Sequence, residues 1–347
     1  MEQKNKNSGV LIIHTGQMGD NLLTTPVVRS IRKALPYAYI AFLTTPQNYH
    51  VFTYNPYLDE ILLLDKSMPP GEYARFLLNI KKRRFDLVFD YLCNPRTALI
   101  TWFSSAARRV GYDLRLRKFA YNVVVTRDPF PKYSVDFKYD LLRAVDIGTD
   151  GYALDLFIPD SARGFATAFI DSIKKGDGPT ITVSPVSRRA YKQWAPERFA
   201  RLSDMLISAL DAHLIFLWGP GEKTYVQQIM YLMKQKPHLS PQTRTIKDIA
   251  ALIERADLHI GNDNGIKHLA VAVGTPTVTV HGPSDPVSWE PPDSPYHVWI
   301  KKDVGCGHCV PRNCKNGLKC LAAVQPEEVM GLVEGLYDRV RKGTQRV

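Results

Sequence analysis

The chain has 347 residues, which is enough for two domains of ordinary size, and it carries 45 Lys and Arg against 34 Asp and Glu. A formal net charge of +11 favours anionic partners, such as nucleotides, phosphorylated glycans, an anionic membrane surface or nucleic acid. No stretch has the uncharged length of a membrane span, and the opening residues MEQKNKNSG lack the apolar core of a secretion signal, so we expect a cytoplasmic protein.

The first half of the chain alternates apolar runs with amphipathic stretches. Residues 9–14 are typical of a buried parallel strand, and residues 21–34, after a short loop, carry apolar side chains at helical spacing. Repeated alternation of this kind predicts a parallel sheet covered on both faces by helices. The pattern also predicts strands at 39–43, 60–64, 86–90 and 110–112, and helices at 73–83, 97–107 and 140–145.

A second alternation begins after a Gly-Asp-Gly-Pro break at 176–179. We therefore predict an α/β protein with two doubly wound parallel-sheet domains, residues 1–160 and 161–325, whose boundary lies between Asp160 and Gly178, and a final amphipathic helix within 326–347. The elements predicted in this half are strands at 180–183, 214–217, 258–260 and 277–280, and helices at 161–175, 199–210, 249–255, 266–273 and 326–341.

Ligands of doubly wound domains bind beyond the carboxyl ends of the strands, and the loop 261–265 lies at such an end. It leads into a helix, so free backbone N–H groups and the positive end of the helix dipole would face an anion there, typically a phosphate. The alternative is that Asp263 or Asn264 is only a helix N-cap and Gly265 only a turn glycine.

The loop 15–20 follows the first strand. It is neither a dinucleotide-binding fingerprint nor a Walker loop. Its notable residue is Asp20, a carboxylate at a helix start that would face the cleft, although an N-cap for a helix beginning at Asn21 is the commoner role of Asp there. Farther on, residues 112–138 interleave Arg and Lys with Tyr and Phe, a mixture that could bind phosphate or nucleic acid but is usually a solvated face.

Four cysteines near the C-terminus are spaced C-x2-C-x4-C-x5-C. This spacing is compact enough for a tetrahedral zinc site, whereas it lacks the usual spacings of an iron–sulfur ligand set. Reduced thiols in a loop, or disulfides formed on isolation, are the alternatives. The residues concerned are Cys306, Cys309, Cys314 and Cys320.

Several ordered motifs resemble glycosyltransferase family nine, the bacterial lipopolysaccharide heptosyltransferases. The opening GQMGDNLLTTP is similar to the G-x-x-G-D loop and L-x-x-T-P of that family, and NPYLDEILLLD and FDLVFDY are similar to the segments that follow. YKQWAPERF resembles its K-x-W-x-x-E-R-F motif, and DNGIKHLAVAVGTP its D-x-G-x-x-H-L-A-x-A-x-G-T-P loop. The chain departs from the family at His14-Thr15, where Arg or Lys is usual, and at Asn264, where Thr or Ser is more frequent.

The resemblance implies a GT-B architecture, in which two Rossmann-like domains face a cleft and the final helix, within 326–347, could cross back to the first. It implies inverting, metal-independent transfer of a heptose from ADP-heptose to an inner-core lipopolysaccharide acceptor, a Kdo or heptose residue. No cofactor would be required, so any zinc would be structural.

The family's functional residues carry over to matching positions. Asp20 would be the general base that takes the proton of the acceptor hydroxyl, in an acceptor-side loop where Gly16 and Gly19 let the backbone approach closely. Lys192 would stabilise the charge that builds on the departing diphosphate. Glu222 would hold the ribose and Asp263 the sugar hydroxyls. The remaining residues expected to bind the nucleotide sugar are Ser184, Ser187, Asn264, Gly265 and His268.

An acceptor of this kind would be met at the inner face of the bacterial inner membrane, so we expect a peripheral protein that visits this anionic surface through its basic residues. The first domain supplies most of the candidate cations. They are Lys81, Lys82, Arg83, Arg84, Arg108, Arg109, Arg115, Arg117 and Lys118.

Three alternatives remain open at this point. The enzyme could use another nucleotide sugar or acceptor within the same family. An anion- or nucleic-acid-binding protein on a similar fold would explain the charge, yet no helix-turn-helix, zinc finger or RNA-binding motif accompanies it, so we expect no nucleic acid partner. A sugar-nucleotide epimerase would explain the fold but not Asp20 in its loop.

Overall fold

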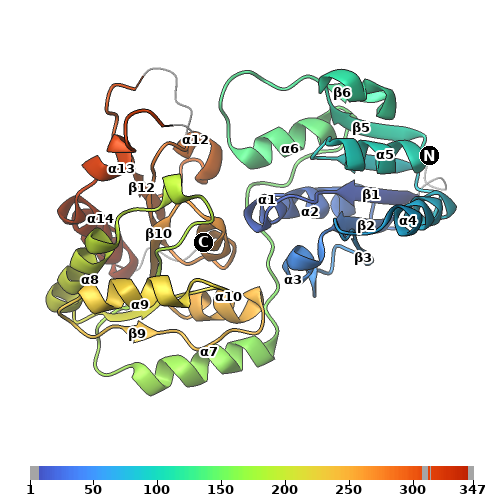
Figure 1. Ribbon diagram of the computed structural model, residues 1–347. Helices are drawn as coiled ribbons and strands as arrows, with labels where there is room; N and C mark the ends of the chain where they lie inside the picture. The colour runs from blue at the N-terminus through green and yellow to red at the C-terminus, as the bar shows by residue number, and fades with distance from the viewer. Residues whose placement is uncertain (1–7, 307–311, 313, 343–347) are drawn as a thin grey trace. The chain divides into compact units, whose positions relative to one another are not determined.

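The computed structural model describes residues 8–306, 312 and 314–342, and the chain divides into two compact units, residues 1–157 and 158–347. Each unit contains one six-stranded sheet, and the strands of both sheets pair in parallel. Helices lie along each sheet (Figure 1). The structure therefore has the two doubly wound α/β units that the alternating pattern predicted.

In the first unit the strand order is β3-β2-β1-β4-β5-β6. The strands are β1 (Gly9–Ile13), β2 (Tyr39–Thr44), β3 (Glu60–Leu63), β4 (Leu87–Asp90), β5 (Arg108–Tyr112) and β6 (Val123–Val125). The helices are α1 (Met18–Leu22), α2 (Thr25–Ala34), α3 (Tyr49–Phe52), α4 (Pro70–Lys82), α5 (Pro95–Phe103) and α6 (Ser134–Arg143), with the 3-10 helices η2 (Pro46–Asn48) and η3 (Arg115–Ala120).

In the second unit the order is β12-β11-β10-β7-β8-β9, which is the same topology written from the other edge. The strands are β7 (Thr180–Ser184), β8 (His213–Phe216), β9 (His238–Leu239), β10 (Leu258–Asn262), β11 (Thr277–Val280) and β12 (His297–Ile300). The helices are α7 (Asp160–Ile173), η4 (Ala190–Lys192), α8 (Pro196–Leu210), α9 (Lys223–Leu232), α10 (Ile246–Glu254), α11 (Gly265–Ala272), α12 (Pro286–Trp289), α13 (Lys319–Ala323) and α14 (Pro326–Arg341).

The central strands are the most apolar ones. All five residues of β1, GVLII, are buried, and β1 pairs on one side with β2 and on the other with β4. In the second sheet β7 and β10 take the equivalent places. The strand order reverses at these two pairs, and ligands of doubly wound sheets bind at the carboxyl ends of the strands at such a point.

The predicted single helix at 21–34 is wrong in detail, because two helices, α1 and α2, occupy this segment. Pro26 lies in the first turn of α2 and has no N–H with which to continue the hydrogen bonds of α1. The hydroxyl of Thr24 donates to the carbonyl of Asp20, at 2.7 Å, and the hydroxyl of Thr25 to that of Leu22, also at 2.7 Å. The break fixes Asp20 near the start of a short helix instead of in a loop.

The final helix α14 packs within the second unit, against α8 and the sheet, and Figure 1 shows α14 and α8 side by side. Its buried residues Val333 and Leu336 join the core around Trp194, whose indole N–H donates to the carbonyl of Val324 at 3.2 Å.

The boundary between the two units falls between Phe157 and Ile158, so α7 belongs to the second unit. Among the described residues no helix combines the length and apolarity needed to cross a membrane.

Candidate functional site

The loop after β1 is held by side chains from its own unit. The Asn21 amide donates to the carbonyls of Gly16 and Gln17, at 3.3 and 2.8 Å, and the Asn48 amide donates to Gly16 as well, at 2.8 Å. The backbone N–H of Gly16 donates to Nδ1 of His14 at 3.2 Å. A Cβ on Gly16 would lie 2.6 Å from the His14 ring, so only glycine allows this contact.

Asp20 lies in the first turn of α1, half-buried, and makes no side-chain cap. The N-cap role considered for it is therefore not observed. Gly19 is buried inside the same helix. Asp20 follows β1 and so lies on the carboxyl side of the first sheet, where ligands of doubly wound domains bind.

Two basic groups that the sequence did not single out as site residues lie near Asp20. Lys138 of α6 is only 6% exposed, and burial lowers its pKa to about 8, although the charge of Asp20 opposes this shift. Burial and the charge of Lys138 lower the pKa of His14 to about 4, so the imidazole is neutral and can accept from Gly16. The ammonium of Lys138 has the Ser134 hydroxyl as a partner, at 3.0 Å, and no ion pair among the described residues.

In the second unit, the loop after β10 leads into α11 as predicted. Asn264 is the N-cap of this helix, because its side chain accepts from the backbone N–H of Lys267 at 3.0 Å. Its amide also donates to the carbonyl of Val186 at 2.9 Å, which ties the loop to the segment after β7. The first N–H groups of α11 therefore face the carboxyl edge of the second sheet.

Asp263 and Lys192 form an ion pair in this loop. Nζ of Lys192, on η4, lies 2.5 Å from Oδ2 of Asp263, which is 3% exposed. Burial would raise the pKa of Asp263, but the charges of Lys267 and Lys192 hold it below its ordinary value. Lys192 also lies over the indole of Trp289, 5.5 Å from the ring centroid. Two predicted site residues that are 71 positions apart in the chain are thus brought together.

A buried charge network extends from this ion pair. Nζ of Lys267 lies 3.0 Å from Oε1 of Glu290 and donates to the carbonyl of Trp289 at 2.6 Å. Nε2 of His281 lies 2.6 Å from the same Glu290 oxygen. Burial opposes ionisation of Glu290, yet Lys267 and His281 lower its pKa to about 2. The network joins the loops after β10 and β11, which carry the candidate donor site.

His268 follows one turn into α11 and is 4% exposed. Burial and the charge of Lys267 lower its pKa well below the ordinary value, so it is neutral. Its Nδ1 has no hydrogen-bond partner among the described residues, and its ring lies 6.2 Å from that of Trp289.

The other predicted donor residues have partners inside the second unit. The hydroxyl of Ser184 lies 3.0 Å from Nε2 of His259, and the hydroxyl of Ser187 accepts from the backbone N–H of Arg189 at 3.3 Å. Glu222 is the N-cap residue of α9 by position, and its carboxylate accepts from the N–H of Gly219 at 2.8 Å. Ser184 ends β7, Ser187 follows it and Glu222 follows β8, so all three lie at the same edge of the sheet as Asp263.

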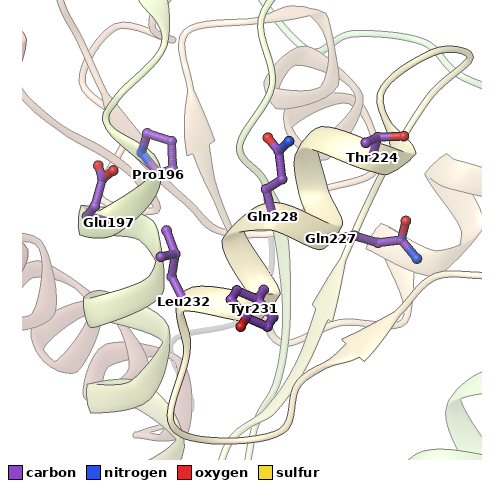
Figure 2. Close-up of a pocket in the computed structure, with 7 residues that line it drawn as sticks. All are labelled: Pro196, Glu197, Thr224, Gln227, Gln228, Tyr231 and Leu232. Atoms are coloured by element: carbon purple, nitrogen blue, oxygen red, sulfur yellow. The ribbon is translucent and has the colours of Figure 1, made fainter.

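A surface hollow of about 490 Å³ lies between α8 and α9 (Figure 2). No predicted donor residue lines it, although Glu222 immediately precedes α9. Its lining residues are Pro196, Glu197, Thr224, Gln227, Gln228, Tyr231 and Leu232.

The zinc hypothesis stays a prediction, because Cys309 lies outside the described residues. Sγ of Cys306 accepts from the Asn316 amide at 3.0 Å, and Sγ of Cys314 from the backbone N–H of Leu318 at 3.4 Å. Cys306 and Cys314 are free thiols. Within the part of the chain that the structure describes, no group of three or more His, Cys, Asp or Glu could hold a metal ion.

Comparison with known proteins identifies the class. The sequence model described as "Glycosyltransferase family 9 (heptosyltransferase)" matches residues 73–319. Lipopolysaccharide heptosyltransferase 3 of Escherichia coli is 24% identical over 284 residues, which cover 79% of this chain and 83% of that protein.

Two solved structures have the same fold. A glycosyl transferase family 9 protein from Veillonella parvula DSM 2008 superposes with a TM-score of 0.87 at 25% identity, covering 98% of this chain and 99% of that one. E. coli ADP-heptose lps heptosyltransferase II gives a TM-score of 0.78 at 19% identity, covering 95% and 99%. These matches confirm the expected GT-B fold class.

The fold and the matched family define an enzyme of the glycosyltransferase class. The chain belongs to glycosyltransferase family 9, the heptosyltransferase family. This membership decides against the nucleic-acid-binding and epimerase alternatives.

The charge network leads to a prediction about acid stability. Ionised Glu290 stabilises the fold above its ordinary pKa of 4.5, and this contribution disappears as pH falls toward its folded pKa of about 2. The shift is worth about 3 kcal/mol. We therefore expect the melting temperature of the parent protein to fall between pH 5 and pH 2, and that of Glu290→Gln, already lower at pH 7, to fall less.

The matched control is Glu327→Gln, which removes an exposed glutamate paired with Arg201. Exposed pairs are screened and contribute little, so this variant should follow the acid profile of the parent. If Glu290→Gln loses melting temperature as steeply as the parent, the low pKa of Glu290 is wrong.

Proposed function

We propose that this enzyme transfers a heptose from ADP-heptose to an inner-core lipopolysaccharide acceptor, with inversion at the anomeric carbon and without a catalytic metal. The observation that carries the proposal is the position of Lys192, an ammonium at the carboxyl edge of the second sheet, beside the loop that opens α11. This combination of a cation and free helix N–H groups suits a diphosphate.

The donor is proposed from the relatives and from this chemistry together. One similar structure is named an ADP-heptose heptosyltransferase, and a similar E. coli protein is named for lipopolysaccharide. In our proposal the amides of Asn264 and Gly265 bind the phosphates, and the Asp263 carboxylate accepts hydroxyls of the sugar. Glu222 would hold the ribose, since a carboxylate can accept from two hydroxyl groups. Another nucleotide sugar or acceptor within the family remains the alternative.

The acceptor side is proposed from Asp20. A sugar hydroxyl is too weak an acid to ionise at neutral pH, so a carboxylate must take its proton while the oxygen attacks the anomeric carbon. The bond between that carbon and the phosphate oxygen breaks on the opposite face, which inverts the configuration. Charge then builds on the diphosphate, where Lys192 and the α11 amides would offset it. Lys138, a buried ammonium near Asp20, favours an acceptor that itself carries a phosphate or carboxylate group.

The first test concerns Asp20. Asp20→Asn keeps the shape of the side chain but cannot accept a proton, so transfer should slow by on the order of 10²–10⁴. ADP affinity in calorimetry should stay that of the parent, because the donor loop lies in the other unit. The control is Asp113→Asn, which changes a partly exposed carboxylate paired with Lys118 in the same unit. An equal loss of ADP binding in Asp20→Asn would contradict the assignment as a base.

The second test concerns Lys192. It would face the diphosphate in both the ground state and the transition state, so Lys192→Ala should weaken ADP binding and slow transfer together. One lost charge-assisted contact costs about 1.5–3 kcal/mol, or roughly ten- to hundredfold. Lys301→Ala, which removes a lysine from the segment after β12, is the control. ADP binding at the parent's affinity in Lys192→Ala would show that this lysine has another role.

We also propose that the protein is cytoplasmic and reaches its acceptor as a peripheral protein on an anionic membrane surface. Some of the basic residues predicted to contact the membrane already have partners within the protein. Arg83 pairs with Glu60, and Lys118 pairs with Asp113 at 2.9 Å, so neither is free for lipid. Arg109 donates to the carbonyl of Ala120 at 2.9 Å, and the side chain of Arg115 lies outside the described part.

The remaining candidate cations differ in the edge of the first sheet at which they lie. Lys81 and Lys82 end α4 and precede β4, so they lie at the amino edge of the parallel sheet, opposite Asp20. Lys66 follows β3 and Arg96 follows β4, so both lie at the carboxyl edge with Asp20. Nη1 of Arg96 donates to the carbonyl of Lys66 at 2.7 Å. An acceptor whose lipid lies in the membrane and whose hydroxyl reaches Asp20 favours the carboxyl edge.

This geometry predicts which cations bind vesicles. Each Lys or Arg near an anionic surface contributes about 1 kcal/mol, so Lys66→Glu/Arg96→Glu should reduce binding to anionic vesicles roughly tenfold or more. Lys81→Glu/Lys82→Glu should reduce it less, and ADP affinity should be unchanged in both variants. Sedimentation with vesicles measures the binding, which should be largely lost at about a few tenths molar salt. Binding that persists at high salt would contradict an electrostatic contact.

A further inference from the structure

Lys267 is an unusual residue for its place in α11. This helix is short and apolar, and Lys267 is nevertheless 1% exposed, between the site residues Gly265 and His268. Its ammonium donates to the carbonyl of Trp289 at 2.6 Å and lies 3.0 Å from Glu290. An ammonium has three N–H groups, so one remains, and Oδ1 of Asp263 lies 4.0 Å from the same nitrogen.

In the proposed function, Asp263 and the donor diphosphate compete for the same cation, Lys192. Oδ2 of the buried Asp263 carboxylate lies 2.5 Å from Nζ of Lys192, and the donor diphosphate would bind the same ammonium. A buried carboxylate that loses its only cation is strongly destabilised. Lys192 can therefore turn to the donor only if another positive charge stays beside Asp263.

We propose that Lys267 is a positioning residue, a second and permanently buried counter-ion that keeps Asp263 in place when Lys192 engages the donor diphosphate. The inference rests on the proposed function, since it assigns Lys192 to a diphosphate. Lys267 acts through Asp263 and Lys192 and does not itself contact the donor.

The surroundings of Lys267 fit this role. Glu290 neutralises it, and Glu290 is in turn held by His281, which is 0% exposed and whose Nε2 lies 2.6 Å from Oε1 of Glu290. Nδ1 of His281 lies 3.2 Å from the Ser284 hydroxyl. These contacts anchor Lys267, whereas Lys192 has a side chain that is 20% exposed and can turn. Burial raises the pKa of Asp263, whereas the charge of Lys267 and both the charge and the hydrogen bond of Lys192 lower it.

A purely structural role for Lys267 is the competing explanation, because its pair with Glu290 could simply join two loops. The two explanations differ in how Lys267 depends on Asp263. If Lys267 only supports the fold, its removal affects ADP binding whether or not Asp263 is charged. If it releases Lys192, its removal matters only while Asp263 holds Lys192.

A double-mutant cycle separates them, with ADP affinity measured by calorimetry on the full chain. Lys267→Met should weaken ADP binding roughly tenfold, because Lys192 stays bound to the otherwise unpaired Asp263. In Asp263→Asn, Lys192 is already released, so adding Lys267→Met should change ADP affinity by less than about threefold. The same factor in both backgrounds, or no effect in either, would overturn the proposal.

A second pair of variants guards against loss of the fold. Lys267→Met leaves Glu290 without its cation, so Lys267→Met/Glu290→Gln removes both charges at once, and the same cycle is measured with and without Asp263→Asn. The expected pattern is unchanged, with melting temperatures recorded for each protein. A parent that binds no ADP contradicts the proposed function and this inference with it. A parent that binds ADP, with equal factors in both backgrounds, contradicts only the role of Lys267.

Discussion

The parallel pairing of the central strands determines where chemistry can occur in this protein. Parallel strands end at one edge, and in each sheet the order reverses beside the first strand, between β1 and β4 or between β7 and β10. Loops with little sequence in common therefore open on equivalent crevices. One crevice receives a carboxylate, Asp20, and the other a cation and a helix start. The same topology used twice thus places the two groups of the proposed mechanism, a general base and an anion site, at equivalent positions.

Burial gives the two crevices different electrostatics. In the second unit, positive and negative groups alternate from Lys192 through Asp263 and Lys267 to Glu290, so each charge has a neighbour of opposite sign. In the first unit Lys138 is buried without an ion pair of its own among the described residues, and its pKa falls accordingly. The charges after β10 and β11 are therefore paired at contact distance, whereas the charges of Lys138 and Asp20 interact without an ion pair in the part of the chain that the structure describes.

The sequence predicted the central strands of both sheets because buried parallel strands are continuous apolar runs. The roles of Asp20, Lys192 and Asp263 came from the family motifs and stay predictions. It did not predict short edge strands such as β9, whose two residues leave almost no pattern. It also did not predict that Lys138, His281 and Glu290 are buried, since an ionisable residue is expected to be exposed unless its partner is known. Lys267 did carry a signal: a lysine inside the apolar run GIKHLAVA requires a buried counter-ion.

The contact between His14 and Gly16 couples two positions of the loop after β1. The imidazole occupies the space that a Cβ at position 16 would need, and it accepts the N–H of that residue. A longer cationic side chain at position 14 would place a charge where this neutral ring now supports the loop. Exchanging one for the other would require the loop and its surroundings to adapt together. Residues 14 and 16 must therefore change together, so a substitution at either one alone should disturb the loop that carries Asp20.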